Sequence, residues 1–294
     1  MSGWIGLLGA VGLLLIGIVV YYPGRGGSEG VENESTVGRI DFAKRVLSKV
    51  PEVTVYFWII KVLCTTVGET FADFLNVNLG LGLTVTTYVM GAALALALVV
   101  QFRLERYVPG VYWLAVVLIS IVGTLITDNL TDNLGMPLWA STVVFSIALA
   151  ITFSAWYASE KTLSIHTIYT RKREAFYWLA ILFTFALGTA AGDLLSEGYG
   201  LGYWKSGIVF ALVIGVVAFA YYRKANAVLT FWIAYIMTRP LGASLGDLAS
   251  QKHANGGLAL GTVWTSAIFL TTILVLVVFL TLTSTDRIEN PERV

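Results

Sequence analysis

The chain has 294 residues, of which 57% are hydrophobic and only 13% are charged, and its formal net charge is +1. A soluble domain carries about 25% charged residues, so this composition excludes an ordinary soluble surface. The balanced charge offers no basic domain for a nucleic acid, and the single cysteine, Cys64, excludes an internal disulfide and a cysteine metal site.

Apolar runs of membrane-spanning length recur along the chain and predict an all-α integral membrane protein with about nine transmembrane helices. The N-terminal segment 1–22 holds the uncharged run 4–22, which has no basic region before it and no small-residue cleavage site after it. We therefore expect a retained helix and not a signal peptide. A polar cytoplasmic linker is expected at 23–50 and a cytoplasmic tail at 283–294. The other expected spans are 53–78, 83–101, 111–133, 138–157, 175–197, 204–222, 228–250 and 262–281.

These eight spans form four tandem units of two helices each within a repeat domain at 51–282. Each unit carries a tryptophan, a glycine and an aspartate at one fixed spacing, Trp-x9-Gly-x4-Asp. The expected units are about 51–108, 109–170, 171–225 and 226–282. Their signatures are Trp58-Gly68-Asp73, Trp113-Gly123-Asp128, Trp178-Gly188-Asp193 and Trp232-Gly242-Asp247. Since each unit has two helices, all four share one orientation, which predicts parallel helical-hairpin repeats after one N-terminal helix.

Four tandem two-helix units, each with its tryptophan, resemble a family of bacterial inner-membrane proteins of four-repeat architecture. That family is known only as membrane-anchored proteins of unknown function. The resemblance covers roughly residues 50–282 and implies a multi-pass protein of the bacterial inner (plasma) membrane.

Lysine and arginine gather in the loops between units, whereas the turns inside units hold only Lys205 and Lys252. By the positive-inside rule, we expect the loops between units and the C-terminus to be cytoplasmic and the N-terminus to be outside. The basic loop residues are Arg103, Arg106, Lys161, Arg171, Lys172, Arg173, Arg223 and Lys224.

Polar side chains recur every fourth residue along the first helix of each unit, so they share one helix face. A charge facing lipid at the bilayer centre costs roughly 2.5–3.5 kcal/mol, and we therefore expect the four faces to converge on a common interior. Positions +3, +7, +11, +15 and +19 from the tryptophans are Lys61-Thr65-Glu69-Asp73-Val77, Val116-Ser120-Thr124-Asp128-Asp132, Ile181-Phe185-Thr189-Asp193-Glu197 and Tyr235-Arg239-Ala243-Asp247-Gln251.

We expect this interior to bind a cation, with Glu69, Asp73 and Asp128 as metal ligands. Lys61 and Arg239 are expected to balance the charge of the empty site. Oxygen ligands without cysteine suit Mn²⁺, Mg²⁺ or Ca²⁺, and crowded carboxylates cannot all stay ionised, so protons would be exchanged for the metal. These patterns predict a proton-coupled exporter of a divalent cation, Mn²⁺ above all, with no fixed cofactor. Further expected binding residues are Asp193, Asp247, Asp132, Thr65 and Asn129.

Two other functions fit the same residues. Carboxylates beside Trp58, Phe185 and Tyr235 could hold a small organic cation such as guanidinium, by charge and cation–π contact. A non-transporting membrane scaffold or sensor is the third alternative. An enzyme is not expected, because no Ser-His-Asp, HExxH or phosphate-binding motif occurs.

Some of these residues are interpreted as having a purely structural role, in helix packing or membrane contact. The glycines are interpreted as sites of close helix packing and the repeat tryptophans as an interfacial belt. The expected partners are the lipid bilayer, the transported cation and protons, and the N-terminal helix is a candidate homodimer contact.

Overall fold

The structure, a computed structural model, describes residues 48–286. Every regular element in this range is helical, and eight helices are long and apolar enough to cross a membrane. This confirms an all-α, multi-pass membrane protein. The helix expected at 4–22, the linker up to residue 47 and the tail beyond 286 lie outside the described residues.

Each unit contributes one first helix and one second helix. The first helices are α3 (Val55–Asp73), α5 (Pro109–Asp128), α7 (Arg171–Asp193) and α9 (Ala227–Ser250). The second helices are α4 (Leu83–Arg103), α6 (Leu138–Glu160), α8 (Tyr203–Tyr222) and α10 (Gly261–Thr283). Short 3-10 turns, η3 (Ile165–Thr167) and η5 (His253–Asn255), lie in the connections.

Three first helices change geometry at the repeat aspartate. The π-helices η1 (Phe74–Asn78), η2 (Asn129–Asn133) and η4 (Leu194–Gly198) directly follow Asp73, Asp128 and Asp193. The fourth first helix, α9, stays α-helical through Asp247. Uniform α-helices were expected through these segments, and a widened turn is a feature that often accompanies functional sites.

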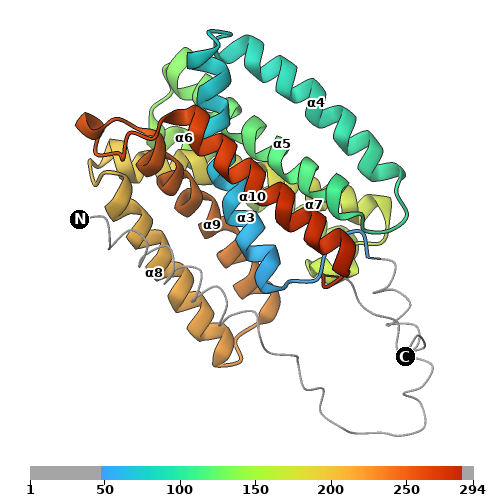
Figure 1. The fold of residues 1–294 in the computed structure, drawn as a ribbon. Coiled ribbons are helices and arrows are strands. Elements are labelled where there is room, and N and C mark those ends of the chain that lie inside the picture. Colours follow the sequence, from blue (N-terminus) through green and yellow to red (C-terminus); the bar gives the residue numbers. More distant parts are fainter. Residues whose placement is uncertain (1–47, 287–294) are drawn as a thin grey trace, which may run out of the picture.

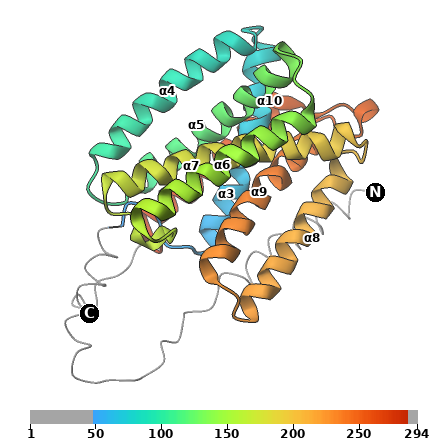
Figure 2. The ribbon, with the colours of Figure 1, turned by 180° about the vertical axis from the view of Figure 1, so that it is seen from behind.

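The four first helices pack in a closed ring. Figure 1 shows the second helix α10 crossing in front of α3. α3 packs against α5 and α9, and α7 packs against the same two helices. Each second helix lies outside the ring against the first helix of the next unit: α4 on α5, α6 on α7, α8 on α9 and α10 back on α3. Figure 2 shows α6 lying over α7 on the face opposite α10. The two helices of a unit therefore separate after their turn, and the fourth unit closes the circle.

Burial distinguishes the first helices from the second helices. Between 56% and 72% of the residues in the spanning windows of the first helices are buried, compared with 17–28% for the second helices. The second helices are apolar all round, so their exposed faces suit contact with lipid. The first helices are therefore the ones that position polar side chains inside.

A glycine in each first helix allows the neighbouring helix to approach closely. A methyl group added at any of these glycines would overlap the side chain at position +7 of the next unit. The distances from that methyl to the neighbouring Cβ would be 2.7 Å for Gly68 and Ser120, 2.8 Å for Gly123 and Phe185, 2.6 Å for Gly188 and Arg239, and 2.7 Å for Gly242 and Thr65. The predicted role of the glycines in close packing is confirmed, and the contacts follow the same circle as the helices.

The repeat tryptophans are buried, so the interfacial belt predicted for them is wrong. Their exposed fractions are 3% for Trp58, 1% for Trp113, 3% for Trp178 and 4% for Trp232. Each follows another aromatic residue, and together they fill one end of the ring with an aromatic cluster of Phe57, Trp58, Tyr112, Trp113, Tyr177, Trp178, Phe231, Trp232 and Tyr235.

The tryptophans of the second helices behave differently. Trp139, Trp204 and Trp264 are 62%, 51% and 69% exposed near the turns inside units. Exposed indoles at one level of a membrane protein are typical of the interface between lipid and water. The exposure of these three indoles agrees with an interfacial position at this end of the molecule.

Substitution of Gly188 by alanine tests the close approach. The added methyl would collide with the Arg239 side chain near its backbone, so we expect a loss of about 1–3 kcal/mol and a lower melting temperature in detergent. Gly91→Ala in α4 is the matched control, because nothing lies within 4 Å of its added methyl and alanine favours a helix by about 0.5–1 kcal/mol. Equal melting temperatures for the two variants would contradict the packing.

Candidate functional site

The polar positions of the first helices lie in layers along the ring. Lys61 and Tyr235 at +3, and Phe185 and Arg239 at +7, are fully buried, with an exposed fraction of 0%. Glu69 at +11 is 8% exposed, and at +19 both Asp132 and Glu197 are exposed. The interior therefore opens gradually from the aromatic cluster toward the end that carries the turns inside units.

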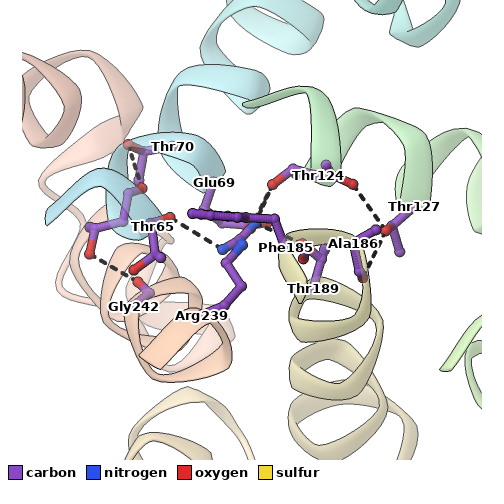
Figure 3. Close-up of polar contacts among 12 residues, drawn as sticks. Thr65, Glu69, Thr70, Thr124, Thr127, Phe185, Ala186, Thr189, Arg239 and Gly242 are labelled. Carbon is purple, nitrogen blue, oxygen red and sulfur yellow. Dashed lines mark hydrogen bonds and ion pairs between the residues drawn. The ribbon is translucent and has the colours of Figure 1, made fainter. Parts of the chain in front are cut away.

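Arg239 occupies the centre of the ring (Figure 3). Its Nη2 donates to Glu69 Oε2 at 3.0 Å, to Thr189 Oγ1 at 2.7 Å and to Thr124 Oγ1. Its Nη1 donates to the carbonyl oxygen of Thr65 at 3.2 Å. The acceptors come from α3, α5 and α7, so one guanidinium of α9 contacts all three other first helices. A side chain with this set of partners lies on the axis.

Lys61 lies one layer nearer the aromatic cluster. Its Nζ donates to Thr238 Oγ1 at 3.3 Å, and it lies 4.3 Å and 4.2 Å from the ring centroids of Phe185 and Tyr235. Phe185 also contacts Arg239, whose Cζ is 5.7 Å from the ring centroid. In residues 48–286, no carboxylate lies within ion-pair distance of Lys61.

The repeat aspartates come together at one level, the carboxylate layer of Asp73, Asp128, Asp193 and Asp247. Asp247 is 8% exposed, and the other three are half-buried. Glu69 interacts electrostatically with all four of them. The four helix faces thus converge on a common interior, as the spacing predicts.

The remaining predicted acidic residues extend this group outward. Asp132 interacts electrostatically with Asp73, Asp128 and Asp193. Glu197 accepts a hydrogen bond from Tyr203 Oη at 3.4 Å. Across the described part of the chain, however, no three Asp, Glu, His or Cys side chains are grouped closely enough to hold one metal ion. A metal ligand set of Glu69, Asp73 and Asp128 therefore stays a prediction.

The side chains of two predicted ligands bond to neighbouring residues instead. The amide nitrogen of Asn129 donates to Thr87 Oγ1 and to the Leu125 carbonyl, each at 2.7 Å, and its Oδ1 accepts from Asn133 Nδ2 at 2.8 Å, so it ties η2 to α4. The hydroxyl of Thr65 donates to the Val62 carbonyl at 2.6 Å and packs on Gly242. In this structure both side chains hold helices together.

Two features of the site were not predicted. The hydroxyls of Thr124 and Thr189 are partners of the buried guanidinium, and their signal was their position at +11, level with Glu69. The aromatic residue that precedes every repeat tryptophan is the second unpredicted feature, and it helps to fill the end of the ring opposite the turns inside units. That doublet recurs in all four units and could have been found by extending the repeat alignment by one position.

Comparison with known proteins supports the repeat. Four consecutive stretches, 56–107, 111–162, 176–226 and 230–286, match the model of one family, described as Repeat of Unknown Function (DUF347). Neither the curated proteins nor the solved structures contain a match to the chain. The matched stretches coincide with the four structural units, so the predicted fourfold repeat is confirmed.

The buried ion pair predicts a coupled loss of stability. Arg239→Met leaves Glu69 without its cation, and we expect a cost of about 3–5 kcal/mol. Adding Glu69→Gln to that variant removes the stranded charge. The double variant should therefore lose at least about 1 kcal/mol less than the sum of the two single variants. Unfolding of all four proteins in one detergent measures the coupling, and strictly additive losses would contradict the pair.

Proposed function

We propose that this chain, which belongs to the DUF347 family of repeats of unknown function, is a secondary transporter of a small cation. A divalent metal ion such as Mn²⁺, exchanged for protons, is the substrate that the residues favour. The observation that carries the proposal is the graded interior of the ring. Carboxylates at its open end lead inward to a buried guanidinium–carboxylate pair, and an aromatic cluster fills the opposite end.

The carboxylate layer supplies the chemistry of a cation site. Oxygen donors from four helices suit a hard divalent ion, and crowded carboxylates cannot all stay ionised, which provides protons for exchange with an arriving cation. The three widened turns place a change of backbone geometry directly after three of these aspartates. A cation that draws several aspartates together would therefore act on the ends of three central helices.

Arg239 holds Glu69 when the cation is absent. The ion pair neutralises Glu69, whose carboxylate lies between the buried centre and the carboxylate layer. A cation that reaches Glu69 replaces the guanidinium as its partner. Arg239 then keeps the oxygens of Thr65, Thr124 and Thr189 as acceptors, so the exchange does not leave the guanidinium without hydrogen bonds.

A small organic cation is the second candidate, and one observation favours it. The centre of the ring already holds a guanidinium, that of Arg239, with a carboxylate, two hydroxyls and the ring of Phe185 around it. Free guanidinium has the same planar shape, with six N–H donors compared with five in the arginine side chain. The two candidates share the cation site and differ in which probe binds to it.

A ligand screen separates these functions. We expect the purified protein to melt at a higher temperature with Mn²⁺ than with Mg²⁺, Ca²⁺, Zn²⁺ or millimolar guanidinium, because a ligand of the folded state stabilises it. Asp128→Asn should weaken Mn²⁺ binding at least about tenfold, equivalent to about 1.4 kcal/mol. Glu105→Gln, in the exposed loop at the opposite end, is the matched control and should bind like the wild type.

Proteoliposomes extend the same test to transport. Uptake of Mn²⁺ should follow a pH gradient and fail in Asp128→Asn. A response to guanidinium alone would favour the organic cation. Binding of neither probe, together with a more stable protein after neutralisation of the aspartates, would favour a non-transporting scaffold or sensor.

The proposed direction of transport depends on the orientation in the plasma membrane, with the loops between units in the cytoplasm. A cysteine at Val77, which is 70% exposed, should react with an impermeant maleimide in intact cells. A cysteine at Glu105 should react only after permeabilisation. The native Cys64 is buried and gives a low background. The reverse pattern of labelling would contradict the orientation.

A further inference from the structure

Lys61 is a charged side chain on the axis that takes no part in the cation site described above. It is fully buried, and the described residues place no carboxylate within ion-pair distance of its Nζ. A buried charge without an opposite partner is costly in a membrane protein, so an ionisable residue in this position is a candidate for a functional role.

The groups around Lys61 are neutral or positive, except for Glu69, which is paired with Arg239. From its own helix come the thiol of Cys64 and, two turns away, Glu69, whose carboxylate pairs with Arg239. From α9 come Tyr235 and Arg239. The phenols of Tyr112 on α5 and Tyr177 on α7 lie in the adjoining aromatic cluster and bond to each other at 2.5 Å. The spanning range of α10 contains no charged residue.

The surroundings accept both the ammonium and the amine. The rings of Phe185 and Tyr235 attract an ammonium, and Thr238 Oγ1 accepts one N–H while donating its own hydrogen to the Tyr235 carbonyl at 2.8 Å. If Lys61 loses a proton, no carboxylate is left without a partner. Arg239 has no such freedom, because a guanidinium stays protonated in proteins.

The surroundings of Lys61 also contain polar groups without protein partners. Among the described residues, the Tyr235 hydroxyl and Nε of Arg239 are buried and form no hydrogen bond. A lysine that served only to lock helices together would be expected in a fully satisfied network. The surroundings of Lys61 are therefore not such a network.

We propose that Lys61 is the group whose proton the transported cation displaces, which makes Lys61 the coupling residue of the proposed transporter. The inference rests on the cation site proposed above. When a cation takes Glu69 from Arg239, the guanidinium loses its counter-charge, and both it and the Lys61 ammonium contact the ring of Phe185. The potential at Lys61 becomes more positive. One N–H bond of the ammonium breaks, its electron pair stays on Nζ, and the proton leaves to water.

The exchange is reversible. The proton from Lys61 offsets the single charge of guanidinium, or one of the two charges of Mn²⁺, whose second charge is offset by a proton from the carboxylate layer. When the cation departs, Glu69 pairs with Arg239 again, and the amine of Lys61 takes up a proton. The coupling thus works through repulsion between like charges and needs no direct contact between Lys61 and the cation.

Proton release on binding tests this role. Wild-type protein in weakly buffered detergent solution is titrated with Mn²⁺, and in parallel with guanidinium, while a pH indicator counts the protons released. Lys61→Met and Lys61→Gln remove the titrating amine, and Lys205→Met, at an exposed position, is the control. Two neutral variants are used so that one folding failure does not end the test.

Both neutral variants should bind the probe and release one proton fewer per cation than the wild type. The pH dependence of their affinity should accordingly be tenfold shallower per pH unit. Lys61→Arg, which cannot lose its charge, should bind the probe more weakly than either neutral variant.

Each other outcome overturns the role of Lys61. Equal proton release by wild type and neutral variants would assign the proton to the carboxylates, with the cation site intact. Binding without any proton release in the wild type would also exclude the coupling and leave cation binding standing. If neither probe binds to the wild type, the proposed function and the coupling role fail together.

Discussion

The interaction on which the rest of the structure depends is the contact of one guanidinium with three neighbouring helices. Arg239 projects from α9 and bonds to oxygens on α3, α5 and α7. A fully buried arginine in a membrane protein is stable only if its charge and its hydrogen bonds are satisfied. Glu69 supplies the charge, and three neutral oxygens supply most of the remaining acceptors. One guanidinium, one carboxylate and three neutral oxygens therefore hold the centre of the ring together.

The fourfold repeat makes this junction possible and also makes it asymmetric. Each glycine of a first helix receives the +7 side chain of the next unit, and the four contacts form a closed circle. Three of those side chains are Thr65, Ser120 and Phe185, and the fourth is Arg239. One backbone frame thus carries four different groups at the same level. The equivalent contacts of the four units form the ring, and the different side chains at equivalent positions form the candidate site.

Much of this arrangement could be predicted from the sequence. The spacing of tryptophan, glycine and aspartate identified the units, and the four-residue period identified the faces that converge on Glu69 and the repeat aspartates. Those inferences succeed because helix geometry fixes which residues share a face, and because the bilayer penalises charges that face lipid.

Other features could not be predicted, since they depend on contacts between units. The packing of α4, α6, α8 and α10 on the following unit leaves no local signal, because these helices are apolar on every side. Residue type alone predicts that the repeat tryptophans lie at the membrane interface, whereas in the structure they pack inside one end of the ring. Asn129 was a predicted binding residue because it follows Asp128 in sequence, yet its side-chain amide donates to Thr87 of α4.

The most direct test of the central claim is an experimental structure of the protein with Mn²⁺, in which anomalous scattering locates the metal. The account predicts manganese between Glu69 and the carboxylate layer, with the guanidinium of Arg239 released from Glu69 and still held by Thr65, Thr124 and Thr189. Manganese found only at surface carboxylates, with the Arg239–Glu69 pair intact at saturating metal, would contradict it.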